Sequence, residues 1–315
     1  MKLATILKAT TLGVSIFVAS PVFATTLTDA LIQAYQTNPS LRVGRSSLRA
    51  TDEGVRQAKA ALEPTVSANI SVDRNETQNP SIDTTPSTNA EIIATLSLFA
   101  GGTVLNGIEQ ARYNVLGVRQ SLKSTEQRIL LDAVTAFMDV RRDQKNVQLA
   151  KNSVKVLNEE VRAASERFEV GEVTRTDVAQ AESRLAASES ELEISRAALN
   201  RSIDFYIATV GSQPKDLRTP PPAPKLPPSA NAAEAIAVAR HPAILQQQFV
   251  VKAAEKAVAI AKGNKAPVIS VNVLAGRSNN NSTILGGPDK QSHGRIGLDI
   301  DQTIYQGGRL NSVQR

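Results

Sequence analysis

The sequence predicts a mainly α-helical protein with β-strands, built from long antiparallel coiled-coil helical hairpins and four strands per chain. Three observations lead to this class. Residues 102–168 contain no proline, and as one helix they would extend roughly 100 Å. Four runs of about ten residues alternate apolar and polar side chains. Motifs near the start of the chain recur about 200 residues later, which indicates an internal duplication.

Residues 1–24 have the pattern of a secretory signal peptide. Lys2 and Lys8 precede an apolar run over 9–18, and Val22-Phe23-Ala24 precedes Thr25. The apolar run is too short to span a bilayer. We therefore expect export by a cleaved signal peptide, with a mature chain that begins near Thr25. The chain has no cysteine, so a lipid anchor is not expected.

Composition argues against several classes of function. The formal net charge of +6 falls to +4 once Lys2 and Lys8 are removed, and the remaining charges alternate in sign along the helices, so no nucleic-acid partner is expected. Without cysteine, no disulfide or thiolate metal site can form. The two histidines, His241 and His293, have no nucleophile or metal-ligand partner at a meaningful spacing. We expect no enzyme, no cofactor and no metal.

The first structural repeat is predicted over 25–229. Thr28 caps the first helix, Asn38-Pro39 interrupts it, and Pro64 follows its end. A proline-rich segment closes the repeat, interpreted as a linker beside the helices; a polyproline ligand is the alternative. In order, the elements are helix 28–62, strands 64–74 and 90–99, long helix 102–168, tip turn 169–173, helix 174–210 and equatorial linker 211–229.

The second structural repeat is predicted over 230–315, because two prolines of the first repeat recur there at the same offset. Pro242 minus Pro39 and Pro267 minus Pro64 both give 203, whereas Gly308 minus Gly102 gives 206. Three extra residues must lie between, and we place them in a polar loop. Loops are expected over 75–89 and 277–293. The predicted elements are helix 231–263, strands 267–276 and 294–305, and the start of a long helix over 308–315.

Each strand pair has one apolar side. In the first strand Val66, Ala68, Ile70 and Val72 alternate with polar neighbours, at the length of a tilted transmembrane strand. A pair of soluble hairpins on a helical body is the alternative. Four strands cannot close a barrel, and open edges would leave backbone groups unpaired in hydrocarbon. A transmembrane sheet would therefore require an obligate oligomer.

The long helices share a heptad seam, and the turn between them is well marked. Apolar seam positions run from Ile108 to Phe168 and return from Val178 to Leu199. Gly171 suits a left-handed helix cap, and Thr174 with Asp177 fits a capping box. The stretch 167–181, RFEVGEVTRTDVAQA, resembles the periplasmic-tip signature of the TolC-like outer-membrane factors. The alternative is that any long antiparallel hairpin needs such a turn.

The resemblance extends over the mature chain and includes Leu27-Thr28-Asp29-Ala30, Asn38-Pro39 and 304–308, IYQGG. It implies a homotrimer with a shared twelve-stranded barrel in the outer membrane lipid of a Gram-negative bacterium and an α-helical tunnel across the periplasm. The implied partners are a periplasmic adaptor (membrane fusion) protein and an inner-membrane transporter, such as an ABC exporter or an RND pump. Such a channel passively conducts proteins or small molecules, and the sequence does not choose between them.

The resemblance also implies roles for particular residues. Thr176 and Asp177 would narrow the periplasmic entrance, although Asp177 could serve only as a helix cap. The adaptor-facing tip would be Val170, Gly171, Glu172, Val173 and Thr174. Turns between barrel and helices are predicted at two glycine pairs, Gly101-Gly102 and Gly307-Gly308.

The alternative class of protein is a periplasmic adaptor or scaffold. A periplasmic coiled-coil adaptor or scaffold without a barrel would share the long hairpin, but it would not need two copies of a strand pair. The second repeat stops within eight residues of Gly307. We therefore expect an incomplete chain that encodes all four strands but lacks the second hairpin and its entrance aspartates, and that does not form a working channel alone.

Overall fold

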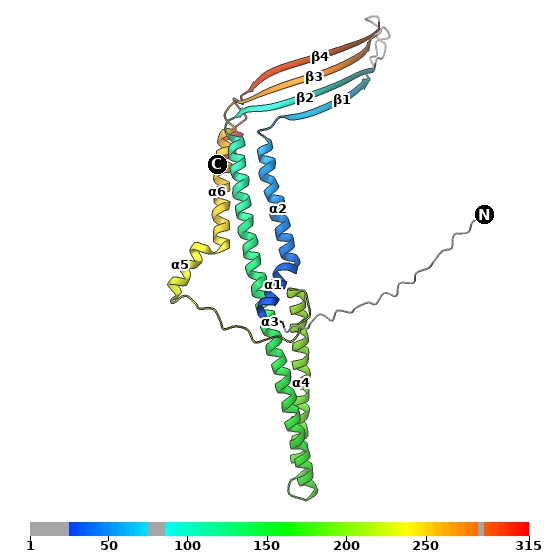
Figure 1. Cartoon of the computed structure of the whole chain (residues 1–315), viewed down its shortest axis with the longest axis vertical. Coiled ribbons are helices and arrows are strands. Elements are labelled where there is room, and N and C mark those ends of the chain that lie inside the picture. Colours follow the sequence, from blue (N-terminus) through cyan, green and yellow to red (C-terminus); the bar gives the residue numbers. More distant parts are fainter. Residues whose placement is uncertain (1–24, 75–85, 283–286, 315) are drawn as a thin grey trace, which may run out of the picture. The chain divides into compact units, whose positions relative to one another are not determined.

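The computed structural model describes residues 25–74, 86–282 and 287–314 (Figure 1), so the predicted signal peptide lies outside the described residues. The chain divides into two compact units. The first unit contains residues up to 36 together with 130–223, and the second contains 37–129 together with 224 onward. The elements are α1 (Leu27–Thr37), α2 (Pro39–Ala60), β1 (Thr65–Arg74), β2 (Pro86–Ala100), α3 (Thr103–Glu169), α4 (Arg175–Val210), α5 (Ala230–Arg240), α6 (Pro242–Gly263), β3 (Val268–Ser282), β4 (Gly287–Asp301) and α7 (Arg309–Gln314).

The first unit is a helical hairpin with a short third helix at its base. Within this unit α4 returns antiparallel to the second part of α3 (Figure 1). Alanines at the contact let the helices approach closely, and the larger Phe137 and Tyr206 fill the remaining space. The buried cluster consists of Ala30, Ala34, Ala133, Ala136, Phe137, Val140, Tyr206 and Val210. This cluster is the main core of the hairpin.

The predicted helix 28–62 is divided in the structure at Asn38-Pro39, where the sequence indicates an interruption, and helix 231–263 is divided in the same way at His241-Pro242. Asn38 accepts a hydrogen bond from the Ser40 amide at 3.0 Å, with Pro39 in the first turn of α2. His241 has the equivalent role, because its Nδ1 accepts a hydrogen bond from the Ala243 amide at 3.2 Å. A proline that follows a capping side chain ends one helix and starts the next. His241 is thus a helix cap.

The second unit contains a four-stranded antiparallel sheet in the order β1-β2-β3-β4. Adjacent strands in the chain are adjacent in the sheet. A register shift between Ser97 and Phe99 marks an irregularity in β2. The outer strands β1 and β4 each pair on one side only within the described residues, so the sheet has two open edges.

The two hairpins of the sheet have the same register. Thr65 pairs with Thr95 in the first hairpin, and Val268 pairs with Asp301 in the second. These partners differ by 268 − 65 = 203 and 301 − 95 = 206, the two offsets found in the sequence. At the far end, Arg74 pairs with Pro86 and Arg277 with Ser292. Eleven residues lie between the first pair and fourteen between the second, so the three extra residues lie beyond this point.

Several predicted strand limits were wrong. β2 and β3 are longer than the predicted strands 90–99 and 267–276, and β4 spans 287–301 rather than 294–305. Polar residues of the expected loops 75–89 and 277–293 join the strands because main-chain pairing does not depend on side-chain polarity; residues 75–85 and 283–286 lie outside the described residues. β4 ends at Asp301 because its partner β3 begins at Val268, directly after Pro267.

Candidate functional site at the hairpin tip, glycine junctions and sheet

The tip turn combines a helix stop with a helix start. Gly171 adopts φ +79°, and its amide donates to the Phe168 carbonyl at 3.0 Å. The Glu172 amide donates to the Arg167 carbonyl at 2.9 Å, which completes a Schellman motif at the end of α3. Only a residue that tolerates positive φ closes this motif without strain.

The start of α4 is a reciprocal capping box. The Thr174 hydroxyl accepts from the Asp177 amide at 3.3 Å, and Asp177 Oδ2 accepts from the Thr174 amide at 2.8 Å. Asp177 Oδ2 also accepts from the Thr174 hydroxyl at 2.7 Å. These hydrogen bonds from Thr174 lower the pKa of Asp177, first through the hydroxyl and then through the amide. Within the described chain, both hydrogen bonds that the Asp177 side chain accepts from Thr174 therefore end on the same oxygen, Oδ2.

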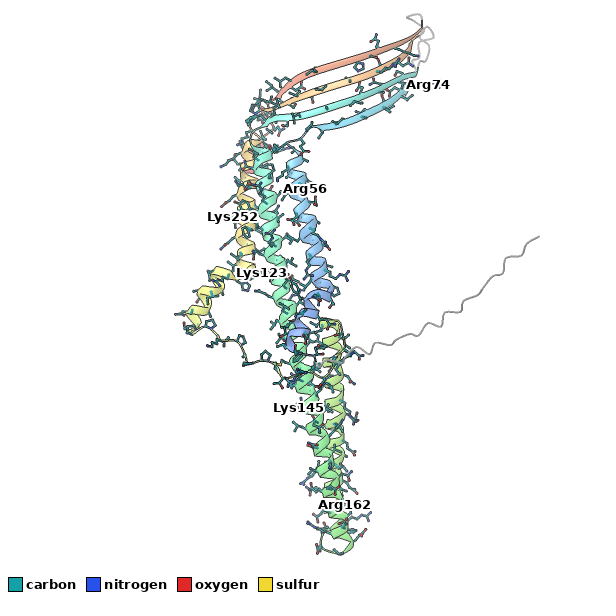
Figure 2. The ribbon with its side chains drawn as sticks, in the orientation of Figure 1. Arg56, Arg74, Lys123, Lys145, Arg162 and Lys252 are labelled. Carbon is teal, nitrogen blue, oxygen red and sulfur yellow. The ribbon has the colours of Figure 1, made fainter. Side chains whose placement is uncertain are left out.

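The remaining tip residues are mostly free to meet another molecule. Val170 is 72% exposed, Glu172 and Thr176 are exposed, and Val173 is half-buried. Arg162 projects from α3 near the tip (Figure 2) and pairs with Glu159 at 2.8 Å. Apart from the half-buried Val173, the predicted tip and entrance residues are thus exposed around the turn.

A groove lies beside this turn between α3 and α4, and the sequence analysis did not identify it. Its volume is about 360 Å³. Alanines form part of its lining, and charged side chains include Arg167 and Asp177. Glu160 and Arg184, also in the lining, form an ion pair across the two helices at 3.3 Å. Their positions could have been found by pairing the charged residues that flank the seam on both sides of the turn.

The glycine pairs form equivalent left-handed turns. φ is +57° and +74° at Gly101 and Gly102, and +55° and +82° at Gly307 and Gly308. A β-carbon on Gly101 would lie 2.3 Å from the Gly263 carbonyl oxygen, whereas one on Gly307 would meet nothing within 4 Å. The first junction therefore needs glycine for both conformation and space, and the second for conformation alone.

The sheet has one apolar face and one polar face. On the polar face the Thr95 hydroxyl donates to Asn272 Oδ1 at 2.7 Å, and Asn272 Nδ2 donates to Asp299. His293, expected in a loop, lies on β4, and its Nε2 is 3.4 Å from Glu91 Oε1. Polar side chains thus contact one another across β2, β3 and β4.

A buried carboxylate in the hairpin was not anticipated. Asp143 of α3 is 3% exposed and accepts a hydrogen bond from Arg142 Nε at 2.9 Å, and one from the Ser202 hydroxyl of α4. The Arg142 hydrogen bond lowers the pKa of Asp143; burial opposes this, and Ser202 adds to the lowering. Ser188, Ser195 and Ser202 follow one another at seven-residue intervals along α4. This spacing is the sequence signal from which the contact of Ser202 could have been predicted.

These features define a class: a long helical hairpin and a four-stranded antiparallel sheet, with paired glycines where strand passes into helix. None of the described helices has the length and apolar character needed to cross a bilayer. In the part of the chain that the structure describes, no group of three or more histidine or acidic side chains could hold a metal ion.

The chain belongs to the outer membrane efflux protein family, whose profile matches residues 30–204, more than half of the chain. The resemblance found in the sequence is thereby confirmed. "Outer membrane efflux protein BepC" of Brucella suis biovar 1 (strain 1330) is 34% identical over 291 residues, covering 92% of this chain and 63% of that protein. The chain thus spans less than two thirds of this relative's length. The family is described by efflux and not by catalysis.

Solved structures confirm the mainly helical fold with a β-sheet. The Campylobacter jejuni CmeC outer membrane channel matches with a TM-score of 0.77 at 13% identity, over 91% of this chain and 63% of that chain. The open state of the Neisseria gonorrhoeae MtrE outer membrane channel matches with a TM-score of 0.74 at 17% identity, over 91% and 65%. At these identities the similarity concerns the fold.

Proposed function

We propose that this chain is a subunit of an outer-membrane channel in a tripartite efflux or type I secretion system. The sheet carries the proposal. Its apolar face is exposed, with Ile70 78% and Ile296 80% accessible, and it includes Val66, Ala94 and Val273 in one cross-strand row. Such a face suits lipid, and the polar face suits a water-filled lumen.

The open edges of the sheet support closure by other copies. β1 and β4 offer 10 and 15 residues of unpaired edge, and each unsatisfied backbone group in hydrocarbon costs several kcal/mol. Pairing β4 of one copy with β1 of the next removes both edges. The family resemblance gives three copies, hence a twelve-stranded barrel, with the helices of the three copies forming a tunnel across the periplasm.

The hairpin tip is our proposed contact for a periplasmic adaptor protein. Val170 and Glu172 are exposed there. The groove beside them is lined by alanines and by both acidic and basic side chains. A helical partner with small apolar residues and flanking charges fits such a groove. Thr176 and Asp177 would line the entrance of the tunnel. An inner-membrane ABC exporter or RND pump would supply the substrate, protein or small molecule, which the channel conducts passively.

Envelope fractionation combined with bilayer recording tests this function. Protein purified from the native bacterium should stay with the insoluble envelope, require detergent for extraction, and have the mass of a trimer by light scattering. It should also conduct ions in planar bilayers. A monomer released with the soluble periplasm would overturn the proposal and favour an adaptor or scaffold without a barrel.

A further inference from the structure

The two junctions between strands and helices carry equivalent pockets. The first, beside Gly102, has a volume of about 200 Å³, and the second, beside Gly308, of about 400 Å³. Lys265 corresponds to Leu62 at the offset of 203, and Ile304, Tyr305, Leu310 and Asn311 correspond to Leu98, Phe99, Val104 and Leu105 at the offset of 206. The two repeats thus carry corresponding pockets, and the second has a lysine and an asparagine where the first has two leucines.

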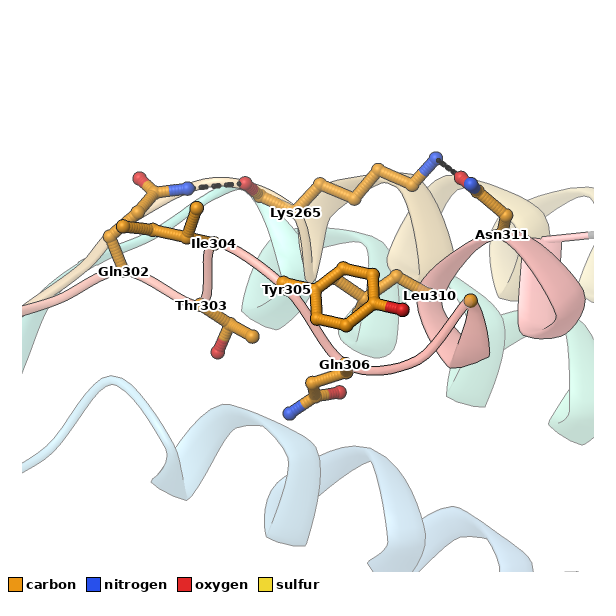
Figure 3. Close-up of a pocket in the computed structure, with 9 residues that line it drawn as sticks. Lys265, Gln302, Thr303, Ile304, Tyr305, Gln306, Leu310 and Asn311 are labelled. Atoms are coloured by element: carbon orange, nitrogen blue, oxygen red, sulfur yellow. Dashed lines mark hydrogen bonds between the residues drawn. The ribbon is translucent and has the colours of Figure 1, made fainter.

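Among the described residues, Lys265 is held by neutral partners, two of these contacts being drawn in Figure 3. Its Nζ donates to Asn311 Oδ1 at 2.9 Å and to Gln314 Oε1 at 2.6 Å, and its carbonyl oxygen accepts from Gln302 Nε2 at 2.9 Å. All three partners are neutral amides. None of the described carboxylates forms an ion pair with Lys265. The ammonium group has three donors, so with respect to the residues that the structure describes, one donor and the positive charge remain available to an anion.

Large apolar side chains stand exposed beside this cation. Ile304 is 92% exposed and Tyr305 is 84% exposed, and both line the pocket just beyond the end of β4. In the first repeat Leu98 and Phe99 are exposed at the equivalent positions. An aromatic ring next to an aliphatic side chain at the end of a transmembrane strand is typical of the boundary between hydrocarbon and headgroups.

We propose that the second junction pocket binds the phosphodiester headgroup of an anionic phospholipid. The Lys265 ammonium donates to a phosphate oxygen, while Ile304 and Tyr305 contact the glycerol and the first carbons of the acyl chains. This inference rests on the proposed function, because it needs the strands to lie in a membrane. The pocket volume of about 400 Å³ lies within the range of roughly 300–1,000 Å³ typical of small-ligand sites.

The first junction pocket is not expected to bind an anionic headgroup. With Leu62 and Leu105 in place of Lys265 and Asn311, it offers neither a cation nor an amide to a phosphate. Its volume of about 200 Å³ falls below the usual range for a ligand. We therefore expect one anionic lipid site per chain.

Lipid titration of the detergent-purified protein, followed by native mass spectrometry, tests the proposal. Dioleoyl phosphatidylglycerol should bind the unmodified protein, and Lys265→Gln should weaken binding about tenfold, as expected for the loss of one hydrogen bond between charged groups. Lys265→Arg should retain binding. Lys151→Gln is the matched control, since it removes one exposed lysine charge from a residue of α3 that does not line the pocket. Circular dichroism establishes that each variant is folded.

Inorganic phosphate distinguishes the two sources of the anion. At the same concentration as the lipid it should leave phosphatidylglycerol bound; equal displacement would show a free-phosphate site and overturn the lipid assignment. Unchanged lipid affinity in folded Lys265→Gln, or the same loss in Lys151→Gln, would also overturn it. Conductance is recorded in parallel. Failure of the unmodified protein, purified from the native bacterium, to conduct counts against the proposed function, whereas normal conductance with Lys265-independent lipid binding counts against this inference alone.

Discussion

Gly101 and Gly263 approach each other so closely that neither position can hold a β-carbon. A β-carbon on Gly263 would lie 2.5 Å from the Gly101 carbonyl oxygen and 2.8 Å from Thr103 Cγ2. The close approach packs the end of α6 against the turn between β2 and α3. At the offset of 203, the residue that corresponds to Gly263 is Ala60, so this contact is particular to one junction.

Gly263→Ala should destabilise the second unit by about 1–3 kcal/mol, because two backbones would have to move apart. Urea unfolding followed by far-ultraviolet circular dichroism measures the change. Gly107→Ala is the control, since a β-carbon on Gly107 meets nothing within 4 Å. That substitution should leave stability unchanged or raise it by about 0.5–1 kcal/mol. Equal effects of the two substitutions would show that the close approach is not rigid.

The cap at the tip and the proposed entrance role of Asp177 can be separated by two substitutions. Thr174→Ala removes the cap hydroxyl and should cost about 1 kcal/mol of helix stability, with no change in conductance. Asp177→Ala removes both the cap partner and the proposed constriction, so it should lower stability and raise ion conductance in planar bilayers. Unchanged conductance in Asp177→Ala would leave the cap as its one role.

The buried carboxylate predicts a pH dependence of stability. Because the folded pKa of Asp143 is lowered, this group stabilises the fold fully above the ordinary carboxyl pKa of about 4, and the contribution is lost as pH falls through the lower folded pKa. Asp143→Asn should cost about 1–3 kcal/mol at pH 7 and flatten the loss of stability toward pH 3.

Urea unfolding between pH 3 and pH 7 measures that difference. Asp132→Asn provides the comparison, because Asp132 lies on the same helix but is only half-buried. It should leave the pH profile unchanged. A profile of Asp143→Asn parallel to that of the unmodified protein would mean that Asp143 does not contribute through its charge.

The two faces of β1 predict opposite responses to a new charge. Ile70→Lys places an ammonium on the apolar face, and in lipid this should cost about 2–4 kcal/mol, seen as loss of detergent-extractable trimer from the outer membrane. Ser71→Lys puts the same charge on the polar face and should leave the trimer intact while changing ion selectivity. Equal recovery of both variants would argue against a membrane-facing apolar side.

Local signals allowed much of this structure to be predicted from the sequence. The left-handed turns follow from Gly101-Gly102 and Gly307-Gly308, and the capping box follows from the spacing of Thr174 and Asp177. What could not be predicted depends on tertiary partners. Gly263 resembles an ordinary helix end until Gly101 is placed against it, and Asp143 resembles other charged positions of α3 until Ser202 meets it.

The limits of the strands also depend on tertiary partners and not on local sequence signals alone. The end of β4 depends on where β3 begins, so the alternating pattern over 294–305 could not determine it. The predicted tip surface follows from the turn, whereas the groove with Glu160 and Arg184 depends on how α3 and α4 pack along their sides.

The shared register of the two hairpins has a consequence for protein engineering. Between Arg74 and Pro86 the chain has three residues fewer than between Arg277 and Ser292, yet every paired position below these points corresponds. Length at the far end of each hairpin can therefore change independently of the rest of the sheet. Peptide tags or reporter epitopes inserted between Arg74 and Pro86 should therefore leave the strand pairing of the sheet intact.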